Sequence, residues 1–397
     1  MEYWLILRHG LILLTLSLLL TACGGGGGSG GAASPSSTTS SNAPNQVPVT
    51  VAQNPAVNTF QTINLPYVTI TVCDNFAHCQ RIDHVILDTG SYGLRILASA
   101  MGSLSLPAIT MANATLAECA TFLGGYMWGG VHAATLQIAG ETAPNIPIEV
   151  VGDPAFPVAP AGCQSTGNTN IGTLTGIGGN GILGVGAFVE DQGDYYACNA
   201  GTCNPAGPVA LSSQVSNPVA FFTTDNNGII VQMPSVPMMG QFIATGTLTF
   251  GIDTQPNNSI AGFQLLPADD KGNFSANITG QVFNQSFIDS GSDYYFIPLS
   301  GLNLNGYGDY APASYTTYDT SLYSAVSPVS TPIHTQIAII NSILLNFGTY
   351  TAFDDIADPG ISNAADFGMP FFYGKSLAFV ISGRKVTEGV GPLYALH

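Results

Sequence analysis

Two short segments of this 397-residue chain carry the same order of residue types. "ILDTGS" places Asp88 behind two apolar residues, and "FIDSGS" places Asp289 behind two apolar residues further along. An aspartate in this position is expected at the end of a buried strand, where loss of solvation raises its pKa. Two such carboxyls within hydrogen-bond reach cannot both ionise, so they share one proton, and one acts as base while the other acts as acid.

This division of roles suits hydrolysis of a peptide bond without a metal. The charged carboxylate takes a proton from a bound water, and the neutral carboxyl donates one to the carbonyl oxygen. The neighbouring glycines let backbone N–H groups approach, the final serines donate to the outer carboxylate oxygens, and the central hydroxyls tie one loop to the other. These supporting residues are Thr89, Gly90, Ser91, Ser290, Gly291 and Ser292. A single copy could be an ordinary turn, but the second copy favours a catalytic pair.

The elements that must position these loops are short β-rich runs, such as "YVTITV", "ATLQIAG", "GTLTFGI" and "SLAFVI". Charged residues make up only 8% of the chain, whereas 47 Gly and 25 Pro are present, which favours strands and turns over helices. Each Asp motif is followed by an apolar residue and glycine, at Gly184 and again at Gly368. We therefore predict an all-β fold with few short helices, made of two similar halves that bring the Asp loops face to face.

The start of the chain carries export signals. Residues 1–22 combine Arg8 with the apolar run "LILLTLSLLL", which predicts a signal peptide. "LTAC" resembles a bacterial lipoprotein signal, in which Cys23 becomes the lipid-bearing residue; an ordinary cleaved signal with an incidental cysteine is the alternative. Residues 23–57 hold few bulky apolar side chains and are predicted to be a flexible tether. Two lobes, 58–253 and 254–397, are expected to follow.

The other six cysteines are an even number, which suits an oxidising compartment. Their spacing favours two local disulfides, Cys73–Cys79 and Cys198–Cys203, which leaves Cys119–Cys163 by subtraction. Six cysteines permit other pairings, so this is a preference. The chain has no C-x-x-C or H-x-x-x-H spacing, so we expect neither a metal site nor a cofactor.

The charge balance argues against one class of partner, and three further motifs lack the features that other functions require. Lys and Arg number 7 against 24 Asp and Glu, a net charge of −17, so nucleic acid is not expected as a partner. "GIGGNG" at 176–181 has no following helix or acid for a dinucleotide, and "SGRK" at 382–385 lacks the partner motifs of acyl-serine enzymes. The acid pairs at 269–270 and 354–355 are interpreted as exposed loop residues and not as Ca²⁺ ligands.

From about Phe60 to Leu396 the order of these motifs resembles the pepsin-like aspartic proteases. The first Asp motif looks like their first aspartate loop, "NGILGVGAF" like the segment that supports it, and "SFIDSGSDYYFIP" like their second loop. The resemblance implies a bilobal double β-barrel with a pseudo-twofold axis, a cleft between the lobes, and Asp88 with Asp289 as the catalytic pair. The chain is also similar to uncharacterised bacterial lipoproteins that carry the same paired motifs.

Two segments depart from that family pattern. "FLGGYMWGG" takes the place of the hairpin flap, and we expect Tyr126 over the cleft, with Phe122 and Trp128 as alternatives; an aromatic cluster that only packs a hairpin is the other reading. Where eukaryotic relatives have an aromatic residue after the first motif, this chain has Arg95, which either favours an ionised Asp88 or pairs with an acid for structural reasons. Tyr294 is expected beside the cleft.

The sequence therefore predicts a monomeric aspartic endopeptidase that cleaves extended polypeptides and is held in the bacterial cell envelope, at the outer membrane, by lipid on Cys23. The alternative is a catalytically silent relative that binds a peptide, glycan or envelope partner in the cleft. Residues 24–60 hold no Lys or Arg, so masking by a basic prosegment is not expected.

Overall fold

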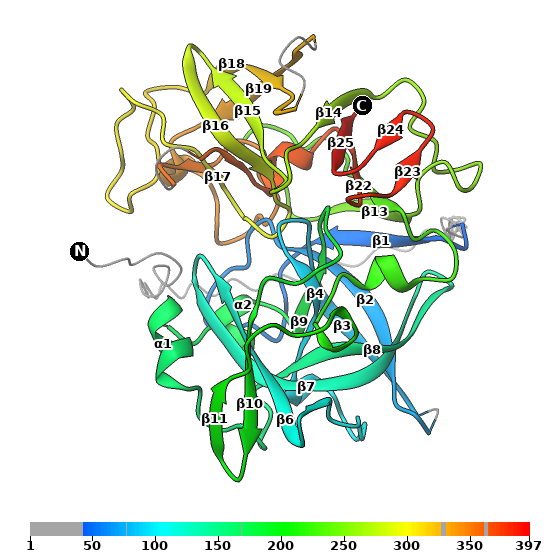
Figure 1. Cartoon of the computed structure of the whole chain (residues 1–397). Coiled ribbons are helices and arrows are strands. Elements are labelled where there is room, and N and C mark those ends of the chain that lie inside the picture. The colour runs from blue at the N-terminus through cyan, green and yellow to red at the C-terminus, as the bar shows by residue number, and fades with distance from the viewer. Residues whose placement is uncertain (1–42, 77, 168, 327–330, 361–363) are drawn as a thin grey trace, which may run out of the picture.

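The computed structural model describes residues 43–397 except 77, 168, 327–330 and 361–363. The fold is all-β, as predicted, and its α-helices are short (Figure 1). The helical segments described are α1 (Ala161–Gly167), α2 (Leu174–Ile177) and the 3-10 turns η1 (Ala98–Ala100), η2 (Leu211–Ser213), η3 (Pro218–Phe221), η4 (Ser342–Leu344) and η5 (Met369–Phe372). The predicted signal peptide and Cys23 lie outside the described residues.

The largest sheet has 16 strands in the described chain. In spatial order they are β11 (Thr202–Pro205), β10 (Asp194–Asn199), β6 (Ala114–Phe122), β7 (Gly125–Ile138), β8 (Glu141–Val151), β4 (Tyr92–Leu97), β9 (Gly181–Val185), β3 (Cys79–Asp88), β2 (Pro66–Cys73), β1 (Gln46–Val51), β13 (Ala244–Phe250), β12 (Gly228–Gln232), β22 (Ser376–Val380), β25 (Leu393–Leu396) and β14 (Gln264–Pro267), with β5 (Thr110–Met111) beside β6.

A second sheet carries the other Asp motif. It has seven strands among the described residues, in the order β19 (Ile333–Ile339), β18 (Thr316–Tyr323), β15 (Phe274–Ile278), β16 (Gln281–Ile288), β21 (Asp366–Phe367), β17 (Tyr295–Phe296) and β20 (Ala357–Asp358). A small hairpin, β23 (Lys385–Val386) with β24 (Gly389–Val390), completes the strands.

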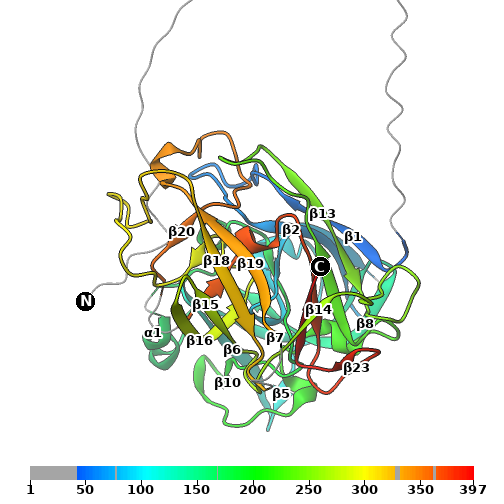
Figure 2. The same ribbon diagram turned by 90° about the horizontal axis from the view of Figure 1, so that it is seen from above.

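Strand β1 corrects the predicted tether, which extended to residue 57. In "QVPVTV" the alternate residues Val49 and Val51 are buried, the period that a half-buried strand requires. Strand β1 pairs with β13 along its whole length and with the start of β2, and Figure 2 shows it lying beside β13. The segment has a low overall hydrophobicity and was therefore predicted to be flexible. Its three valines, at every second position, supply enough apolar surface to order it.

The same strand arrangement occurs around both Asp motifs. Strand β3 runs parallel to β9, β9 is antiparallel to β4, and β4 is parallel to β8. Correspondingly, β16 runs parallel to β21, β21 is antiparallel to β17, and β17 is parallel to β20. Each apolar-Gly segment noted in the sequence therefore lies beside the strand that ends in the Asp motif. The chain contains an internal structural repeat.

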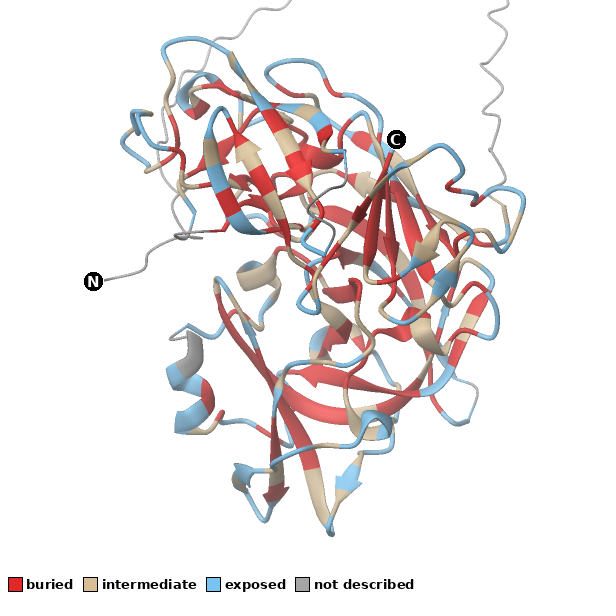
Figure 3. Ribbon diagram, turned by 45° about the horizontal axis from the view of Figure 1, so that its top comes forward, coloured by how far each residue is buried: buried red, intermediate tan, exposed pale blue. Residues whose placement is uncertain are grey.

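One apolar core runs beneath both motifs. Leu87 and Leu183 from the first repeat belong to the same buried cluster as Ile288 and Phe367 from the second. Strands β9 and β25 are buried along their whole length, and Figure 3 shows this for β25, which ends near the C label. The residues just before each Asp are thus fixed by packing, so the loops that follow start from rigid strands.

The described part of the chain contains three disulfides: Cys73–Cys79, Cys119–Cys163 and Cys198–Cys203. Disulfide bonding is therefore confirmed, and the pairs are those that the spacing favoured. Within the part of the chain that the structure describes, no helix is long and apolar enough to cross a bilayer.

The disulfide between β6 and α1 should contribute most to stability. Cys119–Cys163 spans 44 residues, whereas Cys73–Cys79 spans 6. If loop closure in the unfolded chain dominates, the Cys119→Ala/Cys163→Ala variant should lose roughly 4 kcal/mol of unfolding free energy, and Cys73→Ala/Cys79→Ala roughly 2 kcal/mol. Urea unfolding of both double variants measures the difference. An equal or reversed loss would contradict the expectation.

Candidate active site

The two Asp loops are joined by reciprocal hydrogen bonds between Thr89 and Ser290. The Thr89 N–H donates to Ser290 Oγ at 3.1 Å, and the Ser290 N–H donates to Thr89 Oγ1 at 2.9 Å. Each hydroxyl then donates across to the other strand, Thr89 Oγ1 to the Ile288 carbonyl at 3.2 Å and Ser290 Oγ to the Leu87 carbonyl at 2.7 Å. All four bonds are buried. The central hydroxyls therefore tie the loops together, the role proposed for them from sequence.

Each Asp carboxyl is held by donors from its own loop. Asp88 Oδ1 accepts from the Gly90 N–H at 2.8 Å and the Ser91 N–H at 3.1 Å, and Ser91 Oγ donates to Asp88 Oδ2 at 2.5 Å. Asp289 Oδ1 accepts from the Gly291 N–H at 2.7 Å, and Ser292 Oγ lies 3.0 Å from Asp289 Oδ2. These bonds fix the orientation of both carboxyls.

The glycines of the motifs are needed for space. A Cβ at Gly90 would lie 2.4 Å from the carboxyl carbon of Asp289, and a Cβ at Gly291 would lie 2.8 Å from that of Asp88. Real Cβ atoms essentially never approach so closely. Each loop therefore leaves room for the carboxyl of the other loop, and the two carboxyls come together as the sequence predicted.

The environment separates the roles of the two acids. Burial, then the charge of Asp88 and then that of Asp366, raise the pKa of Asp289 well above its ordinary value, and a side-chain hydrogen bond joins Asp289 to Asp88. The raised pKa favours the neutral form of Asp289. Asp88 is buried, while Asp289 retains partial exposure to solvent. The pair can hold one proton between a base and an acid.

Two residues near the pair were not predicted. Asp366, in β21, is buried, and its Oδ2 lies 2.6 Å from Ser292 Oγ. Asp366 lies in the "DFG" segment, which the sequence pattern singled out only for its glycine. The acid two residues before that glycine could have indicated a further carboxyl near the pair. Tyr92 follows the first motif, and burial with the charges of Asp88 and Asp289 raises the pKa of its phenol.

Arg95 lies in a buried ion-pair cluster, which agrees with the structural alternative for this residue. Its guanidinium pairs with Glu118 of β6, with Asp191 at 2.8 Å and with Glu149 of β8 at 3.2 Å. Its Nη1 also donates to the Tyr92 carbonyl at 2.6 Å. Three carboxyls surround one cation, so the cluster needs protons on some of the acids to stay near neutrality.

The β6–β7 hairpin, visible in Figure 1, does not turn Tyr126, the residue expected over the cleft, toward the Asp88 strand. Tyr126 and Trp128 lie on one face of it, packed with the Cys119–Cys163 disulfide, and the indole of Trp128 donates to the Phe156 carbonyl at 2.9 Å. Phe122 lies on the opposite face, toward β3 and β4, with its ring centroid 5.9 Å from the Arg95 guanidinium carbon. Alternation along the strand puts Tyr126 on the outer face, so Phe122 is the aromatic residue turned toward the Asp88 strand.

Two further expectations differ from the structure. Tyr294 is buried in an apolar cluster and stacks on Phe296 with ring centroids 6.0 Å apart, so it packs beneath the second loop. Asp355, expected as an exposed loop acid, is fully buried, and its Oδ2 accepts from the Met239 N–H at 3.1 Å. In both cases the next residue in the chain, Tyr295 or Ile356, is buried in the core, and its burial carries the preceding residue inward.

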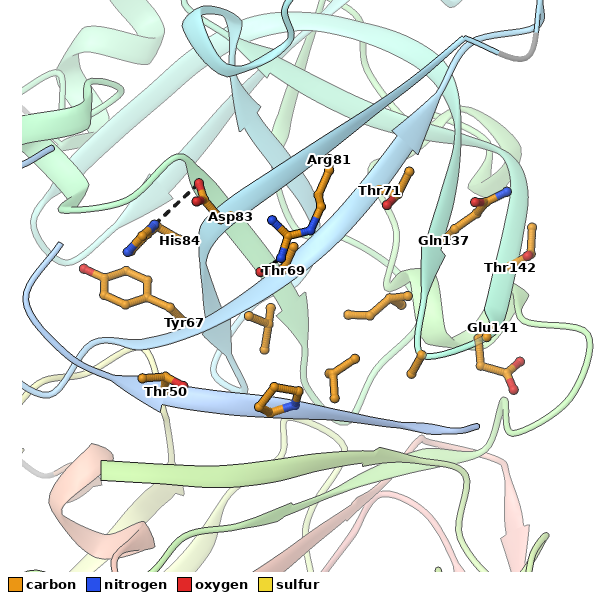
Figure 4. Close-up of a pocket in the computed structure, with 16 residues that line it drawn as sticks. Thr50, Tyr67, Thr69, Thr71, Arg81, Asp83, His84, Gln137, Glu141 and Thr142 are labelled. Atoms are coloured by element: carbon orange, nitrogen blue, oxygen red, sulfur yellow. Dashed lines mark hydrogen bonds and ion pairs between the residues drawn. The ribbon is translucent and has the colours of Figure 1, made fainter. Parts of the chain in front are cut away.

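A surface hollow lies away from the Asp pair. It has a volume of about 830 Å³ and is bounded by strands β1, β2, β3, β7 and β8 (Figure 4). Its labelled lining side chains are Thr50, Tyr67, Thr69, Thr71, Arg81, Asp83, His84, Gln137, Glu141 and Thr142. Neither Asp of the pair contributes to it. In the described chain no group of three or more His, Cys, Asp or Glu is arranged to hold a metal ion.

Comparison with known proteins gives a family for this sequence. Residues 41–396 match the model of a family described as "Protein of unknown function (DUF3443)". The chain belongs to this family. No curated protein matches it significantly. The match includes both Asp loops, the β6–β7 hairpin and the Arg95 cluster.

The Arg95 cluster should make stability depend on pH. Burial first, with the charge of Asp191 adding, raises the pKa of Glu149 from 4.5 to about 8, although Arg95 acts in the opposite direction. The folded state therefore holds a proton that the unfolded state releases above 4.5. The contribution of this proton to the free energy of unfolding is complete below pH 4.5. It is lost as the pH rises from 4.5 through about 8, by up to about 1.4 kcal/mol per pH unit.

Glu149→Gln, a neutral side chain of the same shape, should reduce this loss. Urea unfolding between about pH 5 and pH 8 measures it, and Glu190→Gln, which alters an exposed acid, is the control. The expectation fails if the Glu149→Gln and parent stabilities fall in parallel with rising pH.

Proposed function

We propose that this protein is an aspartic endopeptidase that hydrolyses peptide bonds through a water activated by Asp88 and Asp289. The observation that carries the proposal is the close approach of the two carboxyls, each fixed by its own loop. Two carboxyls held in contact, one of them buried, are costly to maintain because they cannot both ionise. The retention of this pair, with two glycines that leave room for it, supports catalysis over a structural role.

In the proposed reaction the pair works as base and acid together. Asp88, as carboxylate, takes a proton from the attacking water, and Asp289 donates its proton to the carbonyl oxygen of the scissile bond. The loop donors Gly90, Ser91 and Gly291 hold the carboxyls at fixed angles through this transfer. Proton return to the leaving nitrogen completes the cycle. Phe122, at the end of β6, is the residue proposed to cover the substrate.

The proposal includes a bilobal pepsin-like fold and an envelope location. The repeated strand arrangement around the two Asp motifs supports two related lobes, at 58–253 and 254–397, with a polypeptide bound between them. The three disulfides agree with folding in an oxidising compartment. We propose export by the signal at 1–22 and attachment to the bacterial outer membrane by lipid on Cys23.

Removing one acid of the pair should abolish cleavage. Asp289→Asn should lower kcat/KM by roughly 10³-fold, because the amide cannot supply the shared proton. The measurement is proteolysis of a denatured-protein mixture by the purified protein between about pH 3 and pH 8. Asp270→Asn, which alters an exposed acid, is the control.

Two outcomes would count against the proposal. Cleavage equal in the parent and the Asp289→Asn variant would assign the activity to a contaminant. Cleavage absent at every pH from a folded parent would favour the catalytically silent relative, and an inhibitor of the pepstatin type that left the melting temperature of the parent unchanged would support the same conclusion.

A further inference from the structure

A third carboxyl adjoins the pair through one hydroxyl. Asp366 lies in β21, opposite Phe287 of β16, and is only 3% exposed. Ser292 Oγ is 2.6 Å from Asp366 Oδ2 and 3.0 Å from Asp289 Oδ2. The other oxygen, Asp366 Oδ1, is buried without a hydrogen-bond partner among the described residues. An unpaired buried oxygen costs a charged carboxylate much more free energy than it costs a neutral carboxyl.

The first repeat has no such acid. The register of β9 against β3 puts Ile182 opposite Ile86, the position that Asp366 takes opposite Phe287. In that repeat Ser91 Oγ donates to Asp88 Oδ2. Because isoleucine fills the corresponding position in the same strand arrangement, packing alone does not require a carboxyl at Asp366.

Ser292 has a single hydroxyl proton and can direct it to only one of the two acids. When Asp366 is protonated it donates to Ser292 Oγ, and the Ser292 proton points to Asp289. When Asp366 is ionised it attracts the Ser292 proton, and Asp289 Oδ2 loses this donor. The titratable groups that face Asp366 are the acids Asp88, Asp289 and Asp293. Burial, with the charges of Asp88 and Asp293, raises the pKa of Asp366.

We propose that Asp366 is a positioning residue that acts on the Asp88–Asp289 pair through Ser292. In the working state Asp366 is itself protonated. When Asp366 ionises, its negative charge keeps the shared proton on the Asp88–Asp289 pair. This role rests on the proposed function. Its sign follows from electrostatics: a negative charge at Asp366 disfavours a second charge on the pair. The redirected Ser292 proton has the same effect, because Asp289 then lacks a donor that stabilises its anion. The pair therefore stays singly protonated to a higher pH than it would alone.

Asp366→Asn tests this in the pH profile of kcat/KM. The amide can still donate to Ser292 Oγ but cannot ionise, so the acid limb should keep its position while the alkaline limb moves to lower pH by about one unit. Asp366→Ile introduces the residue type that the first repeat has at this position, and it should move the alkaline limb in the same direction. This variant replaces Asp366→Asn in the test if the amide variant does not fold. Asp358→Asn, a buried acid of the same sheet, is the control and should keep the parent profile. Alkaline limbs that coincide in the parent and both Asp366 variants would overturn the proposal.

A second measurement separates this proposal from the proposed function. Infrared difference spectra at neutral pH, parent minus Asp366→Asn, should contain the carbonyl band of one protonated carboxylic acid. The band should persist in the Asp289→Asn background, because it belongs to a different side chain. If the parent cleaves nothing but the band is present, the endopeptidase assignment fails while the protonated third carboxyl stands. A difference spectrum that shows the loss of an ionised carboxylate would overturn the role of Asp366 whatever the activity.

Discussion

The contact between two aspartate side chains depends on the hydroxyl bonds that join Thr89 to Ser290. Two carboxyls brought together in a poorly solvated place repel one another as soon as both ionise, and each also loses its hydration. The four buried bonds between the loops oppose this separation, at about 1 kcal/mol each. They work because each loop leaves a strand already fixed by packing. The repeated strand arrangement is the scaffold that makes such a symmetrical link possible.

Much of this could be predicted from sequence because the determining signals are local. The Asp motifs end apolar runs, the apolar-Gly segments repeat in the same order, and two cysteine pairs are close in the chain. The all-β class followed from composition and alternation. The features that the sequence could not show, such as the three acids around Arg95, depend on partners far apart in the chain. Arg95 meets acids from β6, from β8 and from the loop after β9, and only the folded sheet shows that these side chains converge on it.

Register was the other source of error. The sequence located the aromatic hairpin, but which of its aromatic residues faces the motif depends on strand parity, and a one-residue difference exchanges the faces. The same holds for Asp366, whose importance follows from its place opposite Phe287 in β16. The end of the tether was misplaced because β1 is ordered by its partners β13 and β2, and its own composition carries little sign of that.

The scarcity of cations explains how this protein treats its buried acids. With 7 Lys and Arg against 24 Asp and Glu, most interior carboxyls have no cation to neutralise them. At Asp289 and Asp366 burial raises the pKa, which favours a neutral, protonated carboxyl where no cation is paired with it. Neutral carboxyls can donate hydrogen bonds, which carboxylates cannot. An interior organised in this way suits a protein whose chemistry needs a protonated acid.

The large sheet also constrains when the protein can fold. Strand β1 pairs with β13, some two hundred residues away, and β25, at residues 393–396, is inserted between β22 and β14. Contacts so remote in sequence form slowly, because long segments must be ordered before any of them is made. During synthesis the sheet therefore stays incomplete, with unpaired edges, until nearly the whole chain has emerged. Such edges invite aggregation, so this topology favours completion of the sheet in one late step.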